Sequence, residues 1–330
     1  MTMNEPAPYV SPSLRGKLCR EESMRRHTSW RAGGVAQCLY QAADLADLQV
    51  FLGTLPVTES VWPVGLGSNL LVRDGGVAGT GILLHGALNE LCVQPDRLIY
   101  VQAGVPGAKL ARYAALNNFQ GAEFCAGIPG TLGGMLAMNA GCYGSEIWQH
   151  VVRVQLITRS GEFIERVPAE YHIGYRSVAL RGGDEEDSGM GKSGFVPASF
   201  SLLASPSEFF VGAWLKFLPG DAEVSRKKIK ALLSQRIASQ PLNLPNAGSV
   251  FRNPPNDYAA RLIESCGLKG RKRGSAQVSE KHANFIVNTG GATAENIEGL
   301  IVEVRDIVEA QTGVVLHPEV KIIGENKTDE

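Results

Sequence analysis

The sequence predicts an α+β protein, and three of its features lead to that prediction. Apolar runs of strand length fill most of the chain up to residue 217, longer helical patterns dominate after residue 222, and two glycine-rich turns interrupt the strand-rich part. The boundary between the strand-rich part and the mixed α/β part is expected near residues 217–222. A chain of 330 residues is long enough for two or three domains with cores of their own.

The strand-rich part alternates strand and helix patterns. Helical spacing of apolar residues predicts helices over residues 44–52 and 108–117. Residues 151–167 are typical of a β-hairpin whose turn is Ser160-Gly161. Between residues 181 and 207 the chain becomes rich in charged and small residues, which predicts an inserted, mobile loop. Further strands are predicted at residues 36–41, 61–64, 81–84, 99–104 and 211–217.

The C-terminal part carries three helical patterns. A basic amphipathic helix is predicted over residues 222–239, and a shorter helix over residues 257–266 that Gly267 ends. A long helix is expected to be capped by Thr293 and to end at Gly313. Residues 314–323 are typical of a final strand. The long helix has an apolar face made of Ile297, Leu300, Ile301, Val304, Ile307 and Val308.

Composition and charge narrow the class of protein. The chain is 44% hydrophobic and 20% charged, which is ordinary for a soluble enzyme. A formal net charge of −1 and a pI near 6.6 argue against a partner made of nucleic acid or anionic membrane. No apolar run approaches the roughly 20 residues that span a bilayer. Residues 1–22 lack the apolar core of a signal peptide and are expected to form a loosely ordered extension.

Cysteine and histidine spacing point to a reduced protein without a metal. The six cysteines lie far apart, with no Cys-x-x-Cys motif, which favours free thiols and a cytoplasmic location. The six histidines show no spacing that is typical of metal ligands. We therefore expect no zinc or iron site.

Two glycine-rich turns are typical of places where bare backbone approaches a ligand. One runs from Gly127 to Gly134 and continues through an almost uncharged segment to Gly144. The other occupies residues 63–72. Free N–H groups in such turns can hold a pyrophosphate, although a single turn more often joins packed elements. Leu70 stands where the Rossmann fingerprint needs a glycine, so the pair favours a dinucleotide held between loops.

Two further motifs are weaker. Residues 189–193 resemble part of a P-loop, but Glu186 replaces its first glycine and no strand precedes it. The basic cluster at residues 269–273 is most simply a solvated loop, although near a site it would attract phosphate groups.

Three polar residues stand in unusual surroundings. Arg176 follows an apolar hairpin, Ser249 follows Gly248 between two prolines, and Glu319 interrupts an apolar run. Each also has a simple structural interpretation: a surface ion-pair partner, a turn or cap residue, and the exposed face of a strand. Taken singly, the sequence leaves these alternatives open.

Taken together and in order, seven motifs resemble those of the UDP-N-acetylenolpyruvoylglucosamine reductase (MurB) family. They are residues 28–34, 63–74, 127–144, 175–176, 248–254, 274–288 and 318–319. The resemblance covers about residues 23–324. It implies a vanillyl-alcohol-oxidase/PCMH-like FAD-binding fold over residues 23–217, in two subdomains that meet near residues 85–100. An α/β substrate-binding domain is implied over residues 218–330.

The resemblance implies an NADPH-dependent flavoenzyme with noncovalent FAD. It reduces UDP-N-acetylglucosamine enolpyruvate to UDP-N-acetylmuramate for peptidoglycan synthesis, and a monomer is expected. One alternative is an FAD-dependent oxidase or dehydrogenase of an alcohol or hydroxy acid, although no histidine lies in either glycine turn to carry a covalent flavin. Another is a non-catalytic binder of flavin or UDP-sugar, against which the joint presence of Arg176, Ser249 and Glu319 counts.

Catalytic roles follow from the same resemblance. Arg176 and Glu319 polarise the substrate carboxylate, and Ser249 protonates the carbon beside it. An arginine fork suits two carboxylate oxygens. Glu319 can donate a hydrogen bond only when protonated, which requires a raised pKa. A positioned serine hydroxyl can protonate an enolate, because an enolate is a strong base.

The resemblance also implies two sets of binding residues. The FAD-binding set is Gly65, Gly67, Ser68, Asn69, Leu70, Ile128, Pro129, Gly130, Gly133, Gly134, Asn139 and Gly141. The substrate-binding set is Tyr175, Arg236, Asn253 and His282. The family usually has a lysine three residues after Arg236, near the diphosphate, where this chain has Ser239; Arg252 or the 269–273 cluster is the expected substitute. One branch of the family has a tyrosine-bearing lid, but residues 181–207 contain no tyrosine, so that role is not transferred.

Overall fold

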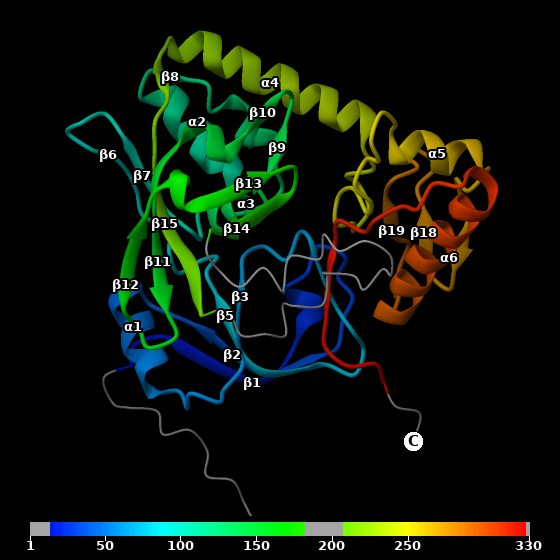
Figure 1. Ribbon diagram of the computed structural model, residues 1–330, viewed down its shortest axis with the longest axis horizontal. Coiled ribbons are helices and arrows are strands. Elements are labelled where there is room, and N and C mark those ends of the chain that lie inside the picture. The colour runs from blue at the N-terminus through cyan, green and yellow to red at the C-terminus, as the bar shows by residue number, and fades with distance from the viewer. Residues whose placement is uncertain (1–13, 182–206, 328–330) are drawn as a thin grey trace, which may run out of the picture.

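The computed structural model describes residues 14–181 and 207–327. Figure 1 shows one sheet below another, a long helix across the end of the upper sheet that faces away from the lower one, and a smaller C-terminal body at the far end of that helix. The loop predicted at residues 181–207 lies outside the described residues except for its two end residues, as does the motif at residues 189–193. Within the described residues, no helix combines the length and the apolar character needed to cross a membrane.

The first sheet has the strand order β1-β2-β5-β3. Its strands are β1 (Lys17–Ser23), β2 (Val35–Gln41), β5 (Val77–Leu83) and β3 (Val61–Val64). Strands β2, β5 and β3 are parallel, and β1 runs antiparallel at the edge. Helix α1 (Leu45–Thr54) packs Leu48 and Phe51 against Tyr40 and Ile82 of the sheet, and Asp44 caps its first turn.

Strand β1 corrects an expectation. Residues 17–22 were expected to belong to a loosely ordered extension, but they pair in register with β2, from Lys17 opposite Gln41 to Ser23 opposite Val35. The sequence signal is weak because an edge strand is held by backbone hydrogen bonds and tolerates charged side chains on its exposed faces. The remainder of that extension, residues 1–13, lies outside the described residues.

The second sheet is entirely antiparallel, with the order β12-β11-β15-β7-β6. The predicted hairpin is confirmed, because β11 and β12 pair on either side of Ser160-Gly161. The strands are β12 (Phe163–Arg166), β11 (Val151–Thr158), β15 (Glu208–Leu215), β7 (Ile99–Gln102) and β6 (Leu91–Val93). Helices α2 (Gly107–Leu116) and α3 (Leu132–Ala137) and the 3-10 helix η2 (Glu123–Gly127) share a buried core with this sheet.

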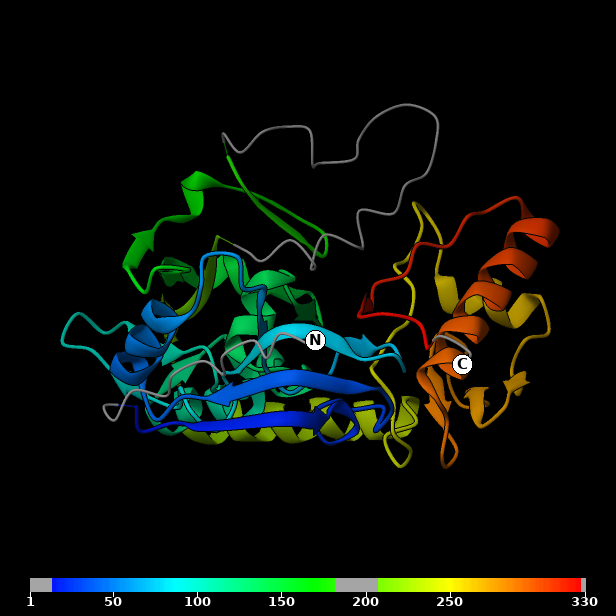
Figure 2. The same ribbon diagram turned by 90° about the horizontal axis from the view of Figure 1, so that it is seen from below.

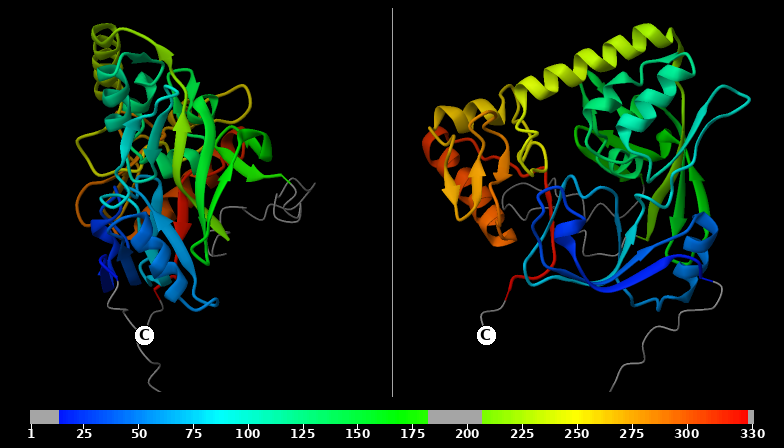
Figure 3. Two further views of the ribbon diagram at one scale, coloured as in Figure 1. Left: turned by 90° about the vertical axis from the view of Figure 1, so that its left-hand side faces the viewer. Right: turned by 180° about the vertical axis from the view of Figure 1, so that it is seen from behind.

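Helix α4 (Ala222–Ser239) has the predicted bounds, and Figure 3 (right) shows it reaching from the second sheet to the C-terminal body. The expectation that it is amphipathic is wrong. Only Ser225 of the helix is buried, and Ile229 and Leu233 pack partly against the core of the second sheet. A helix that bridges two bodies is wetted on most sides, so it needs no continuous apolar stripe.

The C-terminal body packs two helices against a small sheet of order β17-β18-β19. Its elements are α5 (Ala259–Ser265), β17 (Lys272–Arg273), β18 (Ala276–Val278), β19 (Ile286–Asn288) and α6 (Ala294–Thr312). The prediction for α6 is confirmed: Thr293 caps its start, Gly313 ends it with φ 73°, and its apolar face is buried, apart from Ile307, which packs partly.

The last segment of the fold returns to the N-terminal part of the chain, where it forms a separate two-stranded sheet. A strand was predicted over residues 314–323, but only β20 (Lys321–Ile323) is regular, and it pairs in parallel with β4 (Leu70–Val72). Before it, Pro318 has no N–H to give a sheet, and the chain is held by irregular backbone contacts with residues 250–252. Figure 2, seen from below, shows this segment passing between the C-terminal body and the first sheet.

The remaining elements are short. The two-stranded sheets pair β13 (Tyr171–Gly174) with β14 (Ser177–Leu180), β9 (Gly141–Cys142) with β10 (Ser145–Glu146), and β8 (Phe119–Gln120) with β16 (Leu218–Pro219). The other 3-10 helices are η1 (Met24–Arg26), η3 (Ile147–His150) and η4 (Pro168–Glu170).

Candidate active site

Arg176 and Glu319, which are far apart in the sequence, meet in the structure. The Nε atom of Arg176 lies 2.8 Å from Oε1 of Glu319, and the two side chains are 19% and 14% exposed. Arg176 comes from the tip of the β13–β14 hairpin, and Glu319 comes from the segment that leads into β20. The structure therefore brings two of the three predicted catalytic groups into direct contact.

The backbone of Arg176 is in an uncommon conformation. The tip of the hairpin is the two-residue turn Tyr175-Arg176, closed by the pair Gly174 and Ser177. Arg176 has φ 53°, in the left-handed region that costs a residue with a side chain roughly 1–2 kcal/mol. Its Nη2 atom donates a hydrogen bond of 3.0 Å to the carbonyl of Gly141. A strained residue with a fixed guanidinium is typical of a functional position.

Ser249 lies on the segment beside Glu319. The N–H of Glu319 donates to the carbonyl of Val250 at 2.7 Å, so the two loops run side by side at this point. Ser249 is half-buried, and the preceding Gly248 has φ 76° with open space where a side chain would stand. The hydroxyl thus sits one residue from the backbone contact that holds Glu319.

Each member of the ion pair is also tied to a different glycine-rich turn. Gly141, which accepts from Arg176, follows the turn at residues 127–134. Asn69, in the turn at residues 63–72, donates from Nδ2 to the carbonyl of Glu319 at 3.1 Å. The two predicted ligand-binding turns and the predicted catalytic pair therefore form one site.

Burial and charge act in opposite directions on Glu319. Burial raises its pKa, while the positive charges of Arg176 and Arg252 lower it, and burial has the larger effect. A raised pKa favours the protonated carboxyl, which is the form that can donate a hydrogen bond.

Two cations complete the electrostatics of the site. Arg252 donates from Nη2 to the carbonyl of Arg176 at 3.3 Å, and its Nε atom is buried without a hydrogen-bond partner among the described residues. Burial lowers the pKa of Lys321, and the charge of Arg252 lowers it further. An excess of buried positive charge beside one glutamate favours an anionic ligand.

Sequence reasoning named Arg252 only as a substitute phosphate contact, and it missed Lys321. Lys321 stands two residues after Glu319 in the sequence. Val320, between them, is buried in the C-terminal core. That alternation of buried and polar residues is the signal that would have found it.

The two glycine turns face one another. A side chain at Gly130 would come within 3.6 Å of the hydroxyl of Ser68, and one at Gly65 would collide with the hydroxyl of Thr131. Gly67 has φ 60°, and a side chain there would collide with the carbonyl of His27. The hydroxyl of Thr131 is buried without a hydrogen-bond partner in the described parts of the chain. An unpaired hydroxyl between two bare turns fits a phosphate-bearing ligand such as FAD.

Other predicted cofactor residues have partners within the protein. Gly133 donates its N–H to the carbonyl of Ala103, and the carbonyl of Gly130 accepts from Gly107. Gly134 has open space where a side chain would stand. Leu70 begins β4, and Ile128 packs partly against the core of the second sheet beside Pro129. Asn139 is buried and hydrogen-bonded on all sides, as described below.

The predicted substrate residues fall into two groups. Tyr175 is 51% exposed, and its ring lies 5.5 Å from the guanidinium carbon of Arg176. Arg236, on α4, donates from Nε to Gln240 at 2.9 Å, and burial lowers its pKa despite the nearby Tyr143 and Cys142. Tyr175 therefore lies at the hairpin tip beside Arg176, and Arg236 lies near Cys142 and Tyr143, which follow the glycine turn at residues 127–134.

Asn253 and His282 have contacts within the C-terminal body. The side-chain oxygen of Asn253 accepts from the N–H of Ala259 at the start of α5. The Nδ1 atom of His282 lies 3.3 Å from the N–H of Asn284, and burial lowers the pKa of this histidine. None of these contacts involves Arg176, Ser249 or Glu319, so for these two residues the structure offers a structural role.

The basic cluster at residues 269–273 is paired with acids of the same body. Lys269 lies near Glu264, Arg271 pairs with Glu303, and Arg273 lies 3.7 Å from Glu295. These contacts agree with the solvated-loop interpretation of the cluster.

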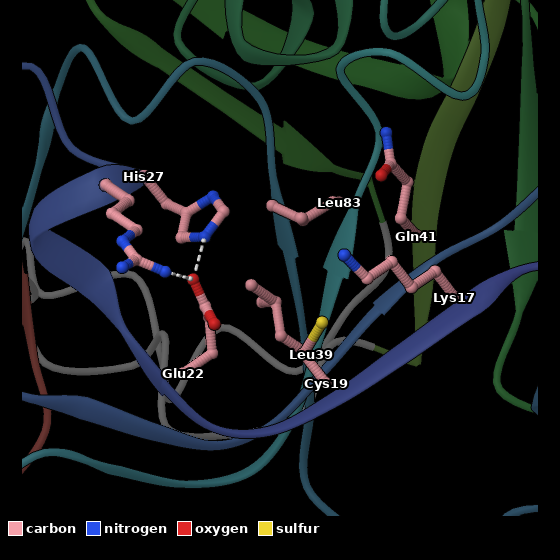
Figure 4. Close-up of a pocket in the computed structure, with 8 residues that line it drawn as sticks. Lys17, Cys19, Glu22, His27, Leu39, Gln41 and Leu83 are labelled. Atoms are coloured by element: carbon pink, nitrogen blue, oxygen red, sulfur yellow. Dashed lines mark hydrogen bonds and ion pairs between the residues drawn. The ribbon is translucent and has the colours of Figure 1, made fainter.

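A hollow of about 140 Å³ lies against strands β1, β2 and β5 of the first sheet. Figure 4 shows Lys17, Cys19, Leu39 and Gln41 around it, beside the hydrogen bond between Glu22 and His27. None of the residues that line it belongs to the predicted site.

Comparison with known proteins places two parts of the chain in known families. Residues 36–166 match the FAD binding domain family, and residues 240–323 match the C-terminal domain of UDP-N-acetylenolpyruvoylglucosamine reductase. The protein of that name from Thiobacillus denitrificans is 52% identical, over 99% of this chain and 98% of its own. That from Nitrosospira multiformis is 56% identical, over 94% and 90%.

A solved structure resembles the whole fold. The UDP-N-acetylenolpyruvylglucosamine reductase (MurB) of Thermus caldophilus superposes with a TM-score of 0.73 at 27% identity, over 94% of this chain and 99% of its own. Similarity of sequence and of structure thus extends over nearly the full length of the chain. The chain belongs to the UDP-N-acetylenolpyruvoylglucosamine reductase family.

Proposed function

We infer that this chain reduces the enolpyruvyl ether of UDP-N-acetylglucosamine to UDP-N-acetylmuramate, with FAD as cofactor and NADPH as reductant, in peptidoglycan synthesis. Relatives at about half identity carry the name of that reductase. The observation that carries the proposal is the buried pair of Arg176 and Glu319, each hydrogen-bonded to a different glycine turn. A hydride carrier between those turns would lie next to the groups that act on the substrate.

The cofactor would be held by backbone rather than by charge. Gly65, Gly67 and Gly130 leave room for close approach, and the hydroxyls of Ser68 and Thr131 are available for a pyrophosphate. When bound there, FAD supplies the hydride that adds to the terminal vinyl carbon of the substrate. The rest of the predicted cofactor set lies along the same two turns, except for Asn139 and Gly141, which follow the turn at residues 127–134.

Arg176 would bind the carboxylate of the enolpyruvyl group. Addition of hydride to the terminal carbon leaves negative charge that spreads over the carboxylate as an enolate. A fixed guanidinium stabilises that charge without reorganising, because Gly141 and Glu319 already orient it. Arg252 adds a second positive charge to the same region.

Glu319 and Ser249 would manage protons. A neutral Glu319 donates a hydrogen bond to a carboxylate oxygen, which the burial of its side chain favours. Ser249 would give its proton to the carbon next to the carboxylate, so the enolpyruvyl ether becomes a lactyl ether. Delivery from one side fixes the configuration at that carbon.

The nucleotide half of the substrate would lie toward α4. Arg236 is half-buried, and the one hydrogen bond described for its guanidinium goes to the neutral Gln240, so its charge is available to a diphosphate. Ser239 carries no charge, and its hydroxyl is already used, because it donates to the carbonyl of Gln235 on the same helix. Lys281 brings a positive charge to this end of α4, where it donates to the carbonyl of Ile237 at 2.6 Å.

We also propose a cytoplasmic location and a monomeric state. All six cysteines are free thiols, which suits a reducing compartment. The ion pair and both glycine turns come from one chain, so the proposed site needs no second copy.

An anaerobic titration tests the proposed function. The purified protein should be yellow, NADPH should bleach the flavin absorbance, and the enolpyruvyl substrate should restore it. Reduced flavin that stays bleached with this substrate contradicts the proposal. Oxygen consumption with an alcohol or hydroxy acid would instead identify an oxidase.

A further inference from the structure

The hairpin that carries Arg176 is not part of either large sheet. Strands β13 and β14 pair only with each other, and most of their residues are exposed. Its tip nevertheless holds Arg176 in a left-handed conformation and aims the guanidinium at Glu319. Contacts from outside the hairpin must therefore fix its tip.

Asn139 supplies one such contact. Its side-chain nitrogen donates to the carbonyl of Gly174 at 3.0 Å, at the residue that closes the turn. The same nitrogen donates to Oε2 of Glu146 at 2.8 Å, and its oxygen lies 3.5 Å from the N–H of Trp148. Asn139 is 1% exposed, and it too has a left-handed backbone, with φ 40°. Both amide protons are thus used within the protein.

The same short segment holds the arginine side chain. Two residues after Asn139, the carbonyl of Gly141 accepts the hydrogen bond from Nη2 of Arg176. Residues 139–141 therefore make two hydrogen bonds to the hairpin. One is to the backbone before the turn, and the other is to the guanidinium of Arg176.

We propose that Asn139 is a positioning residue that sets the orientation of Arg176 toward the substrate carboxylate. This inference rests on the proposed function, and it assigns the side chain of Asn139 a task different from the cofactor contact that the sequence suggests. The amide locks the distance between the hairpin tip and the segment that receives the guanidinium. Without it, the guanidinium loses its fixed direction while the glycine turns keep their shape.

The Asn139→Asp variant tests this directly, because it keeps the size of the side chain and replaces two donors with acceptors that face acceptors. Reoxidation of reduced flavin by the enolpyruvyl substrate should slow on the order of a hundredfold, as expected when a binding group is misplaced. Reduction of the flavin by NADPH and the affinity for FAD should each change by less than about threefold. Binding of UDP-N-acetylmuramate, measured by calorimetry, should weaken several-fold.

A matched control separates positioning from general loss of stability. Asn288 is also a buried asparagine, and its side-chain nitrogen donates to the carbonyl of Trp30 at 2.9 Å, away from the catalytic pair. The Asn288→Asp variant should lose thermal stability but keep the ratio of the two half-reaction rates. If Asn139→Asp does not fold, Asn139→Gly relieves the positive φ and removes the same hydrogen bonds.

A double-mutant cycle decides whether Asn139 acts through Arg176. In an Arg176→Ala background, the Asn139 change should slow reoxidation by less than about twofold, because no guanidinium remains to be positioned. A full additional loss in that background overturns the proposal, as does release of FAD or equal slowing of both half-reactions. If wild-type protein and the Asn288→Asp control both fail to be reoxidised, the proposed function itself is wrong.

Discussion

At the scale of single residues, the site depends on side chains that the sequence separates widely. Arg176 and Glu319 could be named only from the joint pattern of motifs, because each has an ordinary explanation by itself. The side chain of Asn253 accepts a hydrogen bond from the first N–H of α5, and its substrate contact stays a prediction. Lys321 was missed for another reason: its only signal is the alternation with the buried Val320, which separates it from Glu319.

Ser249 gives the first prediction at this scale. Replacing Ser249 with alanine should leave flavin reduction by NADPH intact and slow reoxidation by the enolpyruvyl substrate on the order of a hundredfold or more, because a general acid is lost. Rapid-reaction absorbance of the flavin measures both steps. Equal slowing of both would indicate a structural serine.

Glu319 gives the second, in the form of a pH dependence. Burial raises its pKa, so the carboxyl keeps its proton at pH values where an ordinary glutamate is ionised. As the pH rises through the raised pKa, the donor is lost and flavin reoxidation by substrate should slow. A Glu319→Gln variant keeps an N–H donor, so its profile should be flat over that range. A wild-type rate that rises with pH in this range would contradict the role of the neutral acid.

At the scale of elements, patterns of period and capping predicted most helices and strands. Local signals account for both long helices: α4 ends just before Pro241, and α6 is capped by Thr293 and ended by Gly313. Strand β1 and the irregular run before β20 could not be predicted, because backbone partners from distant segments decide them. The same holds for the turn contacts that link Asn69 to Glu319.

One link between elements yields a stability prediction. Both carboxylate oxygens of Asp74, just after β4, accept from the first N–H groups of α6, at Ala294 and Glu295. Replacing Asp74 with alanine should lower the free energy of unfolding by about 1 kcal/mol, the usual value of a lost helix cap. Urea unfolding measures it. Asp306→Ala, on the exposed face of α6, is the matched control and should cost less than about half as much.

At the scale of the whole molecule, the C-terminal body is not separate from the N-terminal part of the chain. Trp30 and Leu71 lie in the same buried core as α5 and α6, and the indole of Trp30 donates to the carbonyl of Ile286 at 2.8 Å. The motif around Trp30 was part of the resemblance, but nothing in its sequence shows that it packs against a segment about 250 residues away. The division of the chain into 23–217 and 218–330 stays a prediction.

This shared core predicts cooperative unfolding. Calorimetry should show a single unfolding transition for the whole described fold. Trp30→Ala should lower the free energy of unfolding by about 3 to 5 kcal/mol, because a fully buried indole is lost. Two separate transitions in the wild-type protein, with only the first moved by the substitution, would show that the bodies unfold independently.

The hydrogen bond from Asn69 to Glu319 has a consequence for biosynthesis. These residues are 250 positions apart, so a ribosome must add most of the chain before the turn near the start meets its partner. A nascent polypeptide that stops short of Glu319 would contain Arg176 without its carboxyl partner, and we expect it to be inactive. The catalytic pair can therefore form only after nearly the whole chain has been translated.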